Sequence, residues 1–311
     1  MNRGAGLLLL VALTGAPEVA SGQGCCTPGS SPLGGLSGSP LQPWQFELGV
    51  ASEAFHLKQA YRGTSRVDDA SRRESRVFTA VAYLRVAVHH RAVALVQLPW
   101  EFSERTAPYI PETGSPAQDF SNSALGDLVT LVLVQVLPLR GPGPYTLNLG
   151  AGIKWPTGPN RNTQDGLILP VELQTGTGST DPVLALVAHA LYAWGSLSAN
   201  AALRLPAEGE TGYEYGNELN FALTGLWRFG GSWHAGLECR GRSAAADFFR
   251  EFLRPNTGGT RITVGPRVVW QPASLPLGVE GSFQLPVFHD LNGTQLGVSE
   301  GAALGLRGTF R

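Results

Sequence analysis

The sequence predicts an all-β protein, a transmembrane antiparallel up-and-down β-barrel of about 12 strands. Three observations support this fold class. Apolar and polar residues alternate with a period of two over long stretches, as in strands with one apolar and one polar face. The connections between these stretches alternate between short turns and long loops. The chain also has 40 Gly among 311 residues and only 15% charged residues, a composition unusual for a soluble enzyme of this size.

Charge and hydropathy exclude two other classes. With 23 Lys and Arg against 24 Asp and Glu the net charge is −1, so no basic surface points to a nucleic-acid partner. The longest apolar run covers residues 128–139 and is interrupted by Gln135 and Pro138. A helix needs roughly 20 apolar residues to span a bilayer, so the sequence argues against a helical membrane protein.

The N-terminus predicts export. Residues 1–22 have the features of a signal peptide, with Arg3 followed by the apolar stretch 7–13 and small residues near a cleavage site. Residues 23–43 are rich in Gly, Pro and Ser and are expected to form a flexible periplasmic lead. The barrel is expected to occupy residues 44–311, and export combined with a barrel places the protein in the outer membrane, with the lipid bilayer as its first partner.

The first six expected strands each turn apolar side chains to one side and polar side chains to the other. In the first, Trp44, Phe46 and Leu48 alternate with Gln45 and Glu47. These strands cover residues 44–56, 75–88, 92–102, 124–138, 144–156 and 182–194.

The last six expected strands repeat the pattern. It is clearest in 214–229, where Tyr215, Leu219 and Phe221 lie on the face opposite Glu218, and the two residues Gly230 and Gly231 then form a hairpin turn. These strands cover residues 196–206, 214–229, 232–243, 260–271, 275–287 and 296–310.

Turns and loops alternate strictly along the chain. Short turns follow every other strand, and the long loops are expected at 57–74, 103–123, 157–181, 207–213, 244–259 and 288–295. Short periplasmic turns and longer extracellular loops are typical of outer-membrane barrels. The apolar run Leu167 to Leu173 is assigned to the third long loop. The alternative, a soluble sandwich or lipocalin-like barrel, would bury a face that here carries charges on many strands.

The polar face predicts a conduit. It carries nine basic and six acidic residues, which would give a mildly basic lumen with a weak anion preference. The alternative is that Arg and Glu on neighbouring strands pair and fill the barrel. The expected lumen residues are Arg85, Lys154, Arg204, Arg228, Arg240, Arg242, Arg261, Arg267 and Arg307, with Glu47, Glu53, Asp127, Glu218, Glu238 and Glu280.

The third long loop is long enough to fold into the mouth and constrict it. Its Thr and Gly run lacks the lysine of a phosphate-binding loop. The residues expected to form the constriction are Pro156, Thr157, Gly158, Gly176, Gly178 and Asp181.

Two groups of residues could carry a chemical site, a strand face at His234 and the adjacent cysteines near the N-terminus. His234 shares a strand face with Ser232 and Glu238, but no hydrolase signature accompanies it, so no enzyme is expected. Cys25 and Cys26 are adjacent thiols that would suit a soft metal such as Cu(I), with an incidental pair as the alternative. No other cofactor is expected.

Several short motifs resemble a known family, the outer-membrane barrels grouped under the label MetA-pathway of phenol degradation. The matching segments are 124–128 (ALGDL), 152–158 (GIKWPTG), 173–181 (LQTGTGSTD) and 284–293 (QLPVFHDLNG). Trp155 stands where the family has an aliphatic residue, and Arg311 follows the Phe310 at which such chains usually end. The resemblance implies a barrel that passes a small solute.

From these patterns we expect an outer-membrane channel for a small, aromatic or hydrophobic solute. The alternative is a closed barrel, filled by salt bridges, with a binding or structural role in the envelope. The state of assembly is left open.

Overall fold

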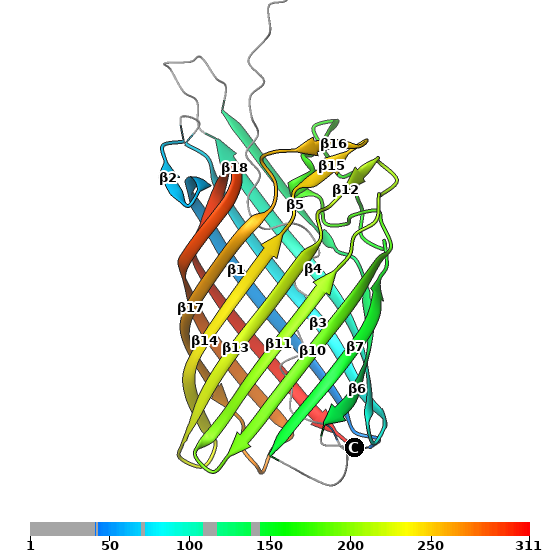
Figure 1. Ribbon diagram of the computed structural model, residues 1–311, viewed down its shortest axis with the longest axis vertical. Coiled ribbons are helices and arrows are strands. Elements are labelled where there is room, and N and C mark those ends of the chain that lie inside the picture. Colours follow the sequence, from blue (N-terminus) through cyan, green and yellow to red (C-terminus); the bar gives the residue numbers. More distant parts are fainter. Residues whose placement is uncertain (1–40, 42, 70–71, 108–116, 138–143) are drawn as a thin grey trace, which may run out of the picture.

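The described chain forms a closed antiparallel β-barrel (Figure 1). The computed structural model describes residues 41, 43–69, 72–107, 117–137 and 144–311. Each strand of the ring pairs with its neighbours in the sequence, and β18 closes the ring by pairing with both β17 and β1. The ring consists of β1 (Phe46–Gly63), β3 (Glu74–His89), β4 (Ala92–Ala107), β6 (Val129–Leu137), β7 (Tyr145–Lys154), β10 (Asp181–Tyr192), β11 (Gly195–Arg204), β13 (Glu218–Phe229), β14 (Trp233–Ala244), β17 (Gly259–Trp270) and β18 (Leu277–Phe310).

The last element, β18, crosses the wall twice. Its first limb pairs with β17 from Val279 to Leu291, and its second limb pairs with β1 as far as Phe310. The Thr309 N–H donates to the Pro276 carbonyl at 2.7 Å, so the two ends of the element lie side by side. The eleven elements therefore cross the wall twelve times, in agreement with the expected number of about twelve strands.

The wall differs from the expected strands mainly at the long-loop end. β1 continues to Gly63 and β4 to Ala107, where β5 (Gln118–Leu125) pairs with β4 above the wall. The expected strand 124–138 is divided, because β5 ends at Leu125 and β6 begins at Val129. The assignment of 167–173 to the third long loop is confirmed, since this loop holds β8 (Thr163–Gln164), β9 (Leu167–Ile168) and the 3-10 turn Val171–Leu173.

The expected strand 214–229 starts too early, because β13 begins at Glu218. Tyr215 lies just after β12 (Tyr213–Glu214), which belongs to a small three-stranded cap with β15 (Asp247–Phe249) and β16 (Phe252–Arg254). The buried Asp247 carboxylate accepts from the Gly216 N–H at 2.8 Å, so the chain is held in the cap until Glu218. A tertiary contact therefore overrides the local alternation.

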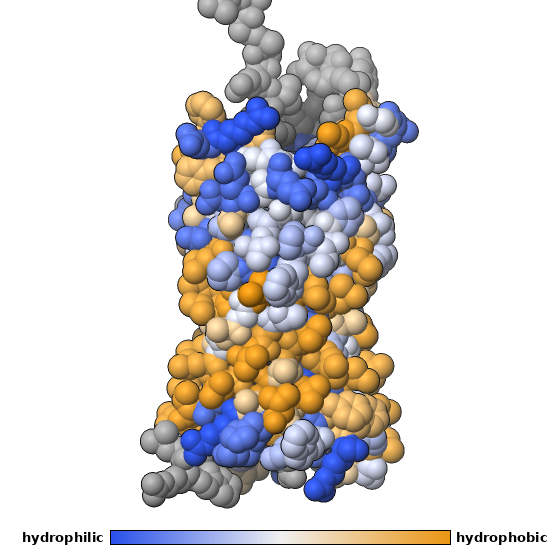
Figure 2. Space-filling model, turned by 90° about the vertical axis from the view of Figure 1, so that its right-hand side faces the viewer, coloured by the Kyte–Doolittle hydropathy of each residue, from blue (hydrophilic) through white to orange (hydrophobic). Residues whose placement is uncertain are grey.

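The outer surface is apolar over a band of the barrel (Figure 2). Leu48, Val132, Leu149 and Leu223 are each about half exposed there. Aromatic rings follow one another at the short-turn end, as in the interfacial girdles of membrane barrels. The ring pairs are Tyr145 with Tyr192, Tyr192 with Trp194, Trp194 with Trp227, and Trp233 with Trp270. Among the described residues, no helix has the length and apolar character that a transmembrane helix needs.

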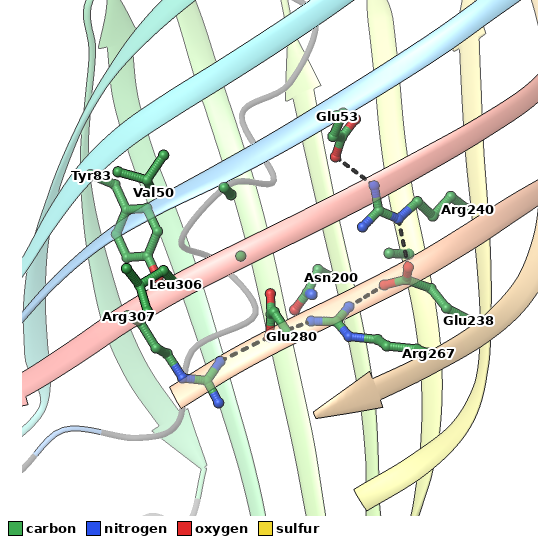
Figure 3. Close-up of a pocket in the computed structure, with 13 residues that line it drawn as sticks. Val50, Glu53, Tyr83, Asn200, Glu238, Arg240, Arg267, Glu280, Leu306 and Arg307 are labelled. Carbon is green, nitrogen blue, oxygen red and sulfur yellow. Dashed lines mark hydrogen bonds and ion pairs between the residues drawn. The ribbon is translucent and has the colours of Figure 1, made fainter. Parts of the chain in front are cut away.

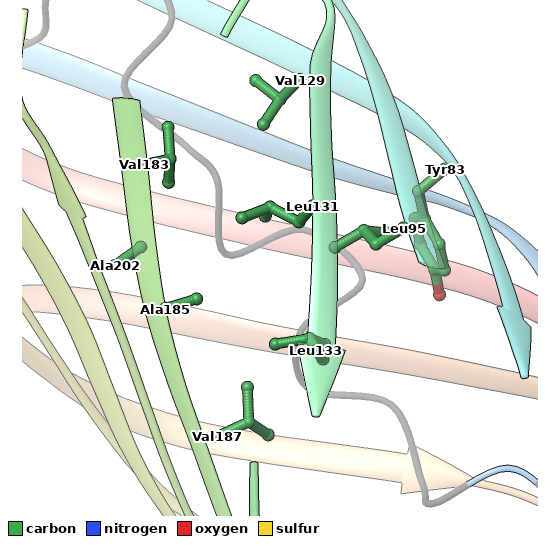
Figure 4. Close-up of a cluster of buried hydrophobic side chains, with 9 residues drawn as sticks. All are labelled: Tyr83, Leu95, Val129, Leu131, Leu133, Val183, Ala185, Val187 and Ala202. Atoms are coloured by element: carbon green, nitrogen blue, oxygen red, sulfur yellow. The ribbon is translucent and has the colours of Figure 1, made fainter. Parts of the chain in front are cut away.

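A cluster of buried apolar side chains also lies inside the barrel (Figure 4). This corrects the expectation of a polar lumen, because several strands on this side are apolar on both faces. On β7 two glycines face inward, and a Cβ on Gly150 or Gly152 would lie 2.6 or 2.7 Å from the Leu133 or Leu131 Cδ2 atom. The two leucines fill the space that these glycines leave. The cluster, called here the apolar half, consists of Tyr83, Leu95, Val129, Leu131, Leu133, Val183, Ala185, Val187 and Ala202.

Candidate functional site: the loop-end network and the lumen

Three of the sequence motifs converge on one buried carboxylate at the long-loop end. Asp127 lies between β5 and β6, and it accepts from the Lys154 Nζ atom at 2.7 Å. It also accepts from the backbone N–H groups of Gly158 and Thr177, each at 2.9 Å. Because Gly158 and Thr177 lie on the two limbs of the third long loop, a single side chain fixes both limbs to the wall.

Lys154 connects this carboxylate to the next strand. Its side chain is fully buried, and its Nζ also donates to the Ser179 carbonyl at 2.9 Å and lies 3.2 Å from Asp181. An unpaired ammonium in such a place would be very costly, so two carboxylates and a carbonyl satisfy it. Asp181, the first residue of β10, is therefore part of the wall that holds the loop.

The network continues around the wall on the next three strands. Arg204 on β11 lies 3.8 Å from Asp181 and 3.1 Å from Glu218 on β13. Glu218 also accepts from Arg242 on β14 at 2.9 Å. We call the set of Asp127, Lys154, Thr177, Asp181, Arg204, Glu218 and Arg242 the loop-end network.

The third long loop packs tightly against itself inside this network. A Cβ on Gly176 would lie 2.1 Å from the Gly158 carbonyl oxygen, so only glycine allows the two limbs to approach this closely. Thr157 accepts from the Leu128 N–H at 2.8 Å, and Pro156 before it is exposed. Gly178 has a φ of +71°, a left-handed conformation that favours glycine. Glu172, from the turn in the loop, is buried against Arg105 of β4.

The cap lies over the same end of the barrel. The Tyr213 hydroxyl donates to the buried Asp247 carboxylate at 2.6 Å, and the Asp247 N–H donates to Thr257 at 2.7 Å. Burial raises the pKa of the Asp247 carboxyl, and the hydrogen bonds from Tyr213 and Gly216 offset part of that rise. Burial likewise raises the pKa of Tyr215 well above its usual value.

Opposite the apolar half, six charged side chains form a continuous ladder (Figure 3). Arg240 pairs with Glu53 and, at 2.8 Å, with Glu238. Arg267 pairs with Glu238 and, at 2.9 Å, with Glu280. Glu280 also accepts from Arg307 at 3.1 Å. We call Glu53, Arg240, Glu238, Arg267, Glu280 and Arg307 the charge ladder.

The ladder carries no net charge, since its three guanidinium groups face three carboxylates. Further up and down the lumen, Arg242 is paired with Glu218, and Arg85 with Glu47 at 3.0 Å. This arrangement differs from the expected Arg-lined conduit with an anion preference. The arginines do face the lumen, but their charge is compensated by neighbouring strands.

Three residues singled out from the sequence lie apart from these groups. Arg228 is exposed near the short-turn end of β13, and its backbone N–H donates to the Trp194 carbonyl. The Arg261 guanidinium lies 4.6 Å from the centre of the Phe55 ring. His234 stands opposite Arg228, whereas the Glu238 carboxylate is engaged by Arg240, Arg267, Gln284 and Thr224. Cys25 and Cys26, together with the expected signal peptide, lie outside the described residues.

A small cavity of about 40 Å³ separates the charge ladder from the apolar half. Its lining includes Arg267 and Glu280 of the ladder, Tyr83 of the apolar half, and Asn200 of β11. Tyr83 and Asn200 are not among the site residues expected from the sequence. Asn200 stands on the polar face of its strand, so its inward direction could be predicted, but nothing in the sequence sets it apart from other polar residues.

The fold is similar to that of solved outer-membrane barrels. An outer-membrane channel from Pseudomonas putida F1 shares 12% sequence identity, and the match covers 87% of this chain and 97% of that chain with a TM-score of 0.66. The monoaromatic hydrocarbon channel CymD has 7% identity over 87% of this chain and 90% of that chain, with a TM-score of 0.45. A FadL homologue from Pseudomonas aeruginosa has 10% identity over 86% of this chain and 90% of that chain, with a TM-score of 0.43.

No protein-family model and no curated protein matches this sequence. The family that its motifs resemble is therefore not shown by these comparisons. The chain has the fold of the Pseudomonas putida outer-membrane channel, an antiparallel β-barrel that closes on itself.

Proposed function

We propose that this protein is an outer-membrane channel that passes a small hydrophobic or aromatic solute. The observation that carries the proposal is the apolar half of the lumen, which runs from Val129 and Val183 below the third long loop to Leu133 and Val187 near the short turns. These side chains are buried against one another, and an interior lined by apolar groups suits an apolar solute better than a charged one. The Pseudomonas putida outer-membrane channel has the same fold, which supports the channel part of the proposal.

In this proposal the third long loop is the gate at the extracellular mouth. Both of its limbs depend on hydrogen bonds to Asp127, and Lys154 neutralises that carboxylate. Movement of the loop would expose the lumen while the wall stays intact, because the wall strands keep their own backbone pairing. Residues 1–22 would direct export, and the apolar outer band would contact lipid.

A closed barrel with a binding or structural role in the envelope is the second candidate. The charge ladder favours it, since paired side chains from four elements reach across the interior. Networks of paired charges make an interior rigid, which a closed barrel needs as much as a channel does. The two candidates differ in whether the loop can leave the mouth.

Single-channel recording in planar bilayers separates them, with heat-shifted gel mobility as the proof of folding. The Asp127→Asn variant weakens both limbs of the loop, so we expect its mean conductance to rise several-fold over that of the natural protein. Thr177→Val removes one hydroxyl from the network and should act in the same direction with a smaller effect.

Arg228→Gln is the matched control, because Arg228 is exposed near the short turns and should leave conductance unchanged. Folded Asp127→Asn and Thr177→Val barrels that stay silent at every voltage would overturn the channel and support the closed barrel.

A further inference from the structure

The cavity between the two halves of the lumen contains an unsatisfied hydrogen-bond acceptor. Asn200 is only 4% exposed, and its Oδ1 atom has no hydrogen-bond partner among the residues that the structure describes. Buried carboxamide oxygens nearly always accept a hydrogen bond, because an unmade one costs free energy. An orphaned oxygen on a cavity wall therefore points to a ligand.

The neighbours of Asn200 cannot supply the missing donor. On the two adjacent strands it stands opposite Val187 and Ala222, both buried and apolar. The nearest cations across the cavity are committed elsewhere, since Arg267 is shared by Glu238 and Glu280. Because no described residue donates to this oxygen, a molecule in the cavity would supply the donor.

The chemistry of the walls restricts the charge of that molecule. An anionic solute would have to draw a guanidinium away from the carboxylates with which it pairs, and a cationic solute would have to draw a carboxylate away from its arginines. Breaking a buried pair leaves an uncompensated charge and is strongly unfavourable. An uncharged hydroxyl can donate to Asn200 without disturbing the ladder.

The opposite wall restricts the rest of the molecule. Tyr83 lines the cavity and also belongs to the apolar half, so the cavity and the apolar surface are continuous at this ring (Figures 3 and 4). A volume of about 40 Å³ holds roughly three water molecules, which is enough for a polar group but not for a ring. The apolar body of the ligand must then lie along the apolar half.

We infer that the cavity at Asn200 is a binding site for small uncharged alcohols, which place the hydroxyl on Asn200 and an apolar body on the Tyr83 side. The inference rests on the proposed channel function and names the class of solute. It makes Asn200 a residue that selects for a hydrogen-bond donor on an otherwise apolar molecule.

Fluorine NMR titration of the full chain in lipid nanodiscs tests it, with empty nanodiscs as the reference for partitioning into lipid. The probes are 4-fluorobenzyl alcohol, 4-fluorotoluene and 4-fluorobenzoate, which share a ring and differ in the polar group. We expect the alcohol to bind most tightly. Asn200→Leu should weaken binding of the alcohol about tenfold and change binding of 4-fluorotoluene less than twofold.

Asn148→Leu is the matched control, because Asn148 faces the lumen on β7 and does not line this cavity. Asn200→Ser is the second variant, in case Asn200→Leu fails to fold. It keeps a small polar group, so its affinity for the alcohol is expected to lie between those of the natural protein and Asn200→Leu. A loss that is equal for alcohol and fluorotoluene, or benzoate binding as tight as alcohol binding, would overturn the inference. Channel conductance without alcohol binding would also overturn it while leaving the proposed function standing.

Discussion

The two halves of the lumen are filled by different kinds of side chain, apolar in one half and charged in the other. On the side of β3, β4, β6 and β10, a cluster of mainly aliphatic side chains packs in the interior, with glycines on β7 that make room for Leu131 and Leu133. On the side of β14, β17 and β18, it is filled by guanidinium and carboxylate groups in alternation. The first half is held by contacts without a preferred direction, whereas the second holds its charged groups in fixed pairs.

The two halves are therefore held together by different forces. Aliphatic contacts are weak, numerous and without direction, so a solute can replace them one at a time. Paired charges in a low-dielectric interior are strong and directional, so they act as a rigid wall. We expect perturbations of the two halves to have different consequences.

Lys154→Met should have the strongest effect, because Lys154 lies in the loop-end network that holds the third long loop to the wall. It leaves Asp127 and Asp181 buried without their shared cation, and removal of one partner of a buried ion pair costs about 3–5 kcal/mol. The free energy of unfolding in urea, followed by gel mobility, should fall accordingly. A variant as stable as the natural protein would show that this network does not hold the structure.

In the apolar half, Leu131→Ala tests packing. Leu131 is 2% exposed, and truncation of a buried leucine typically costs about 2–5 kcal/mol. We expect a loss at the lower end of this range, with a rise in the passage of apolar solutes, because the lumen widens next to Gly152. A stability loss with unchanged passage would mean that this surface is core and not a path.

In the charged half, two opposite substitutions test the neutrality of the ladder. Glu238→Gln leaves the ladder with one excess positive charge, and Arg240→Gln leaves it with one excess negative charge. In a salt gradient the reversal potential should therefore shift toward anions in the first variant and toward cations in the second, by a few millivolts in each case. Shifts of the same sign in both variants would contradict the paired arrangement.

The smallest expected effect is a pH dependence confined to the cap, outside both halves. Since burial raises the pKa of Asp247 in the folded state, the stability that its protonation contributes is present below the unfolded pKa and is lost as the pH rises through the folded value. Hydrogen exchange, corrected for intrinsic rates, should show the Gly216 amide less protected at pH 7 than at pH 4. Asp247→Asn should remove this dependence, and a dependence that persists in the variant would assign it to another group.

The positions of the strands could be predicted to within a few residues because alternation is a local property. The pleat of a single strand is enough to place Leu219 and Phe221 on one face and Glu218 and Asn220 on the other. The ends of strands were less predictable, as at Tyr215, because the contact of Gly216 with Asp247 joins segments far apart in the sequence. The convergence of Asp127, Lys154 and Thr177 could not be predicted either, because it also joins segments far apart in the sequence, although each residue lies in a motif.

The class of fold, the alternation of turns and loops, and the inward direction of most of the charged residues follow from the pattern of the chain, with the exposed Arg228 as an exception. That Arg240 faces Glu53 across the closure of the barrel, and that Asn200 lies on a cavity between unlike walls, depends on the tertiary structure. The physical reason is that the direction of a side chain follows from its place on one strand, whereas its partner follows from the register and curvature of the whole wall. A count of charges along the chain therefore left two interpretations open, a basic conduit or paired side chains, and the ion pairs between neighbouring strands favour the second.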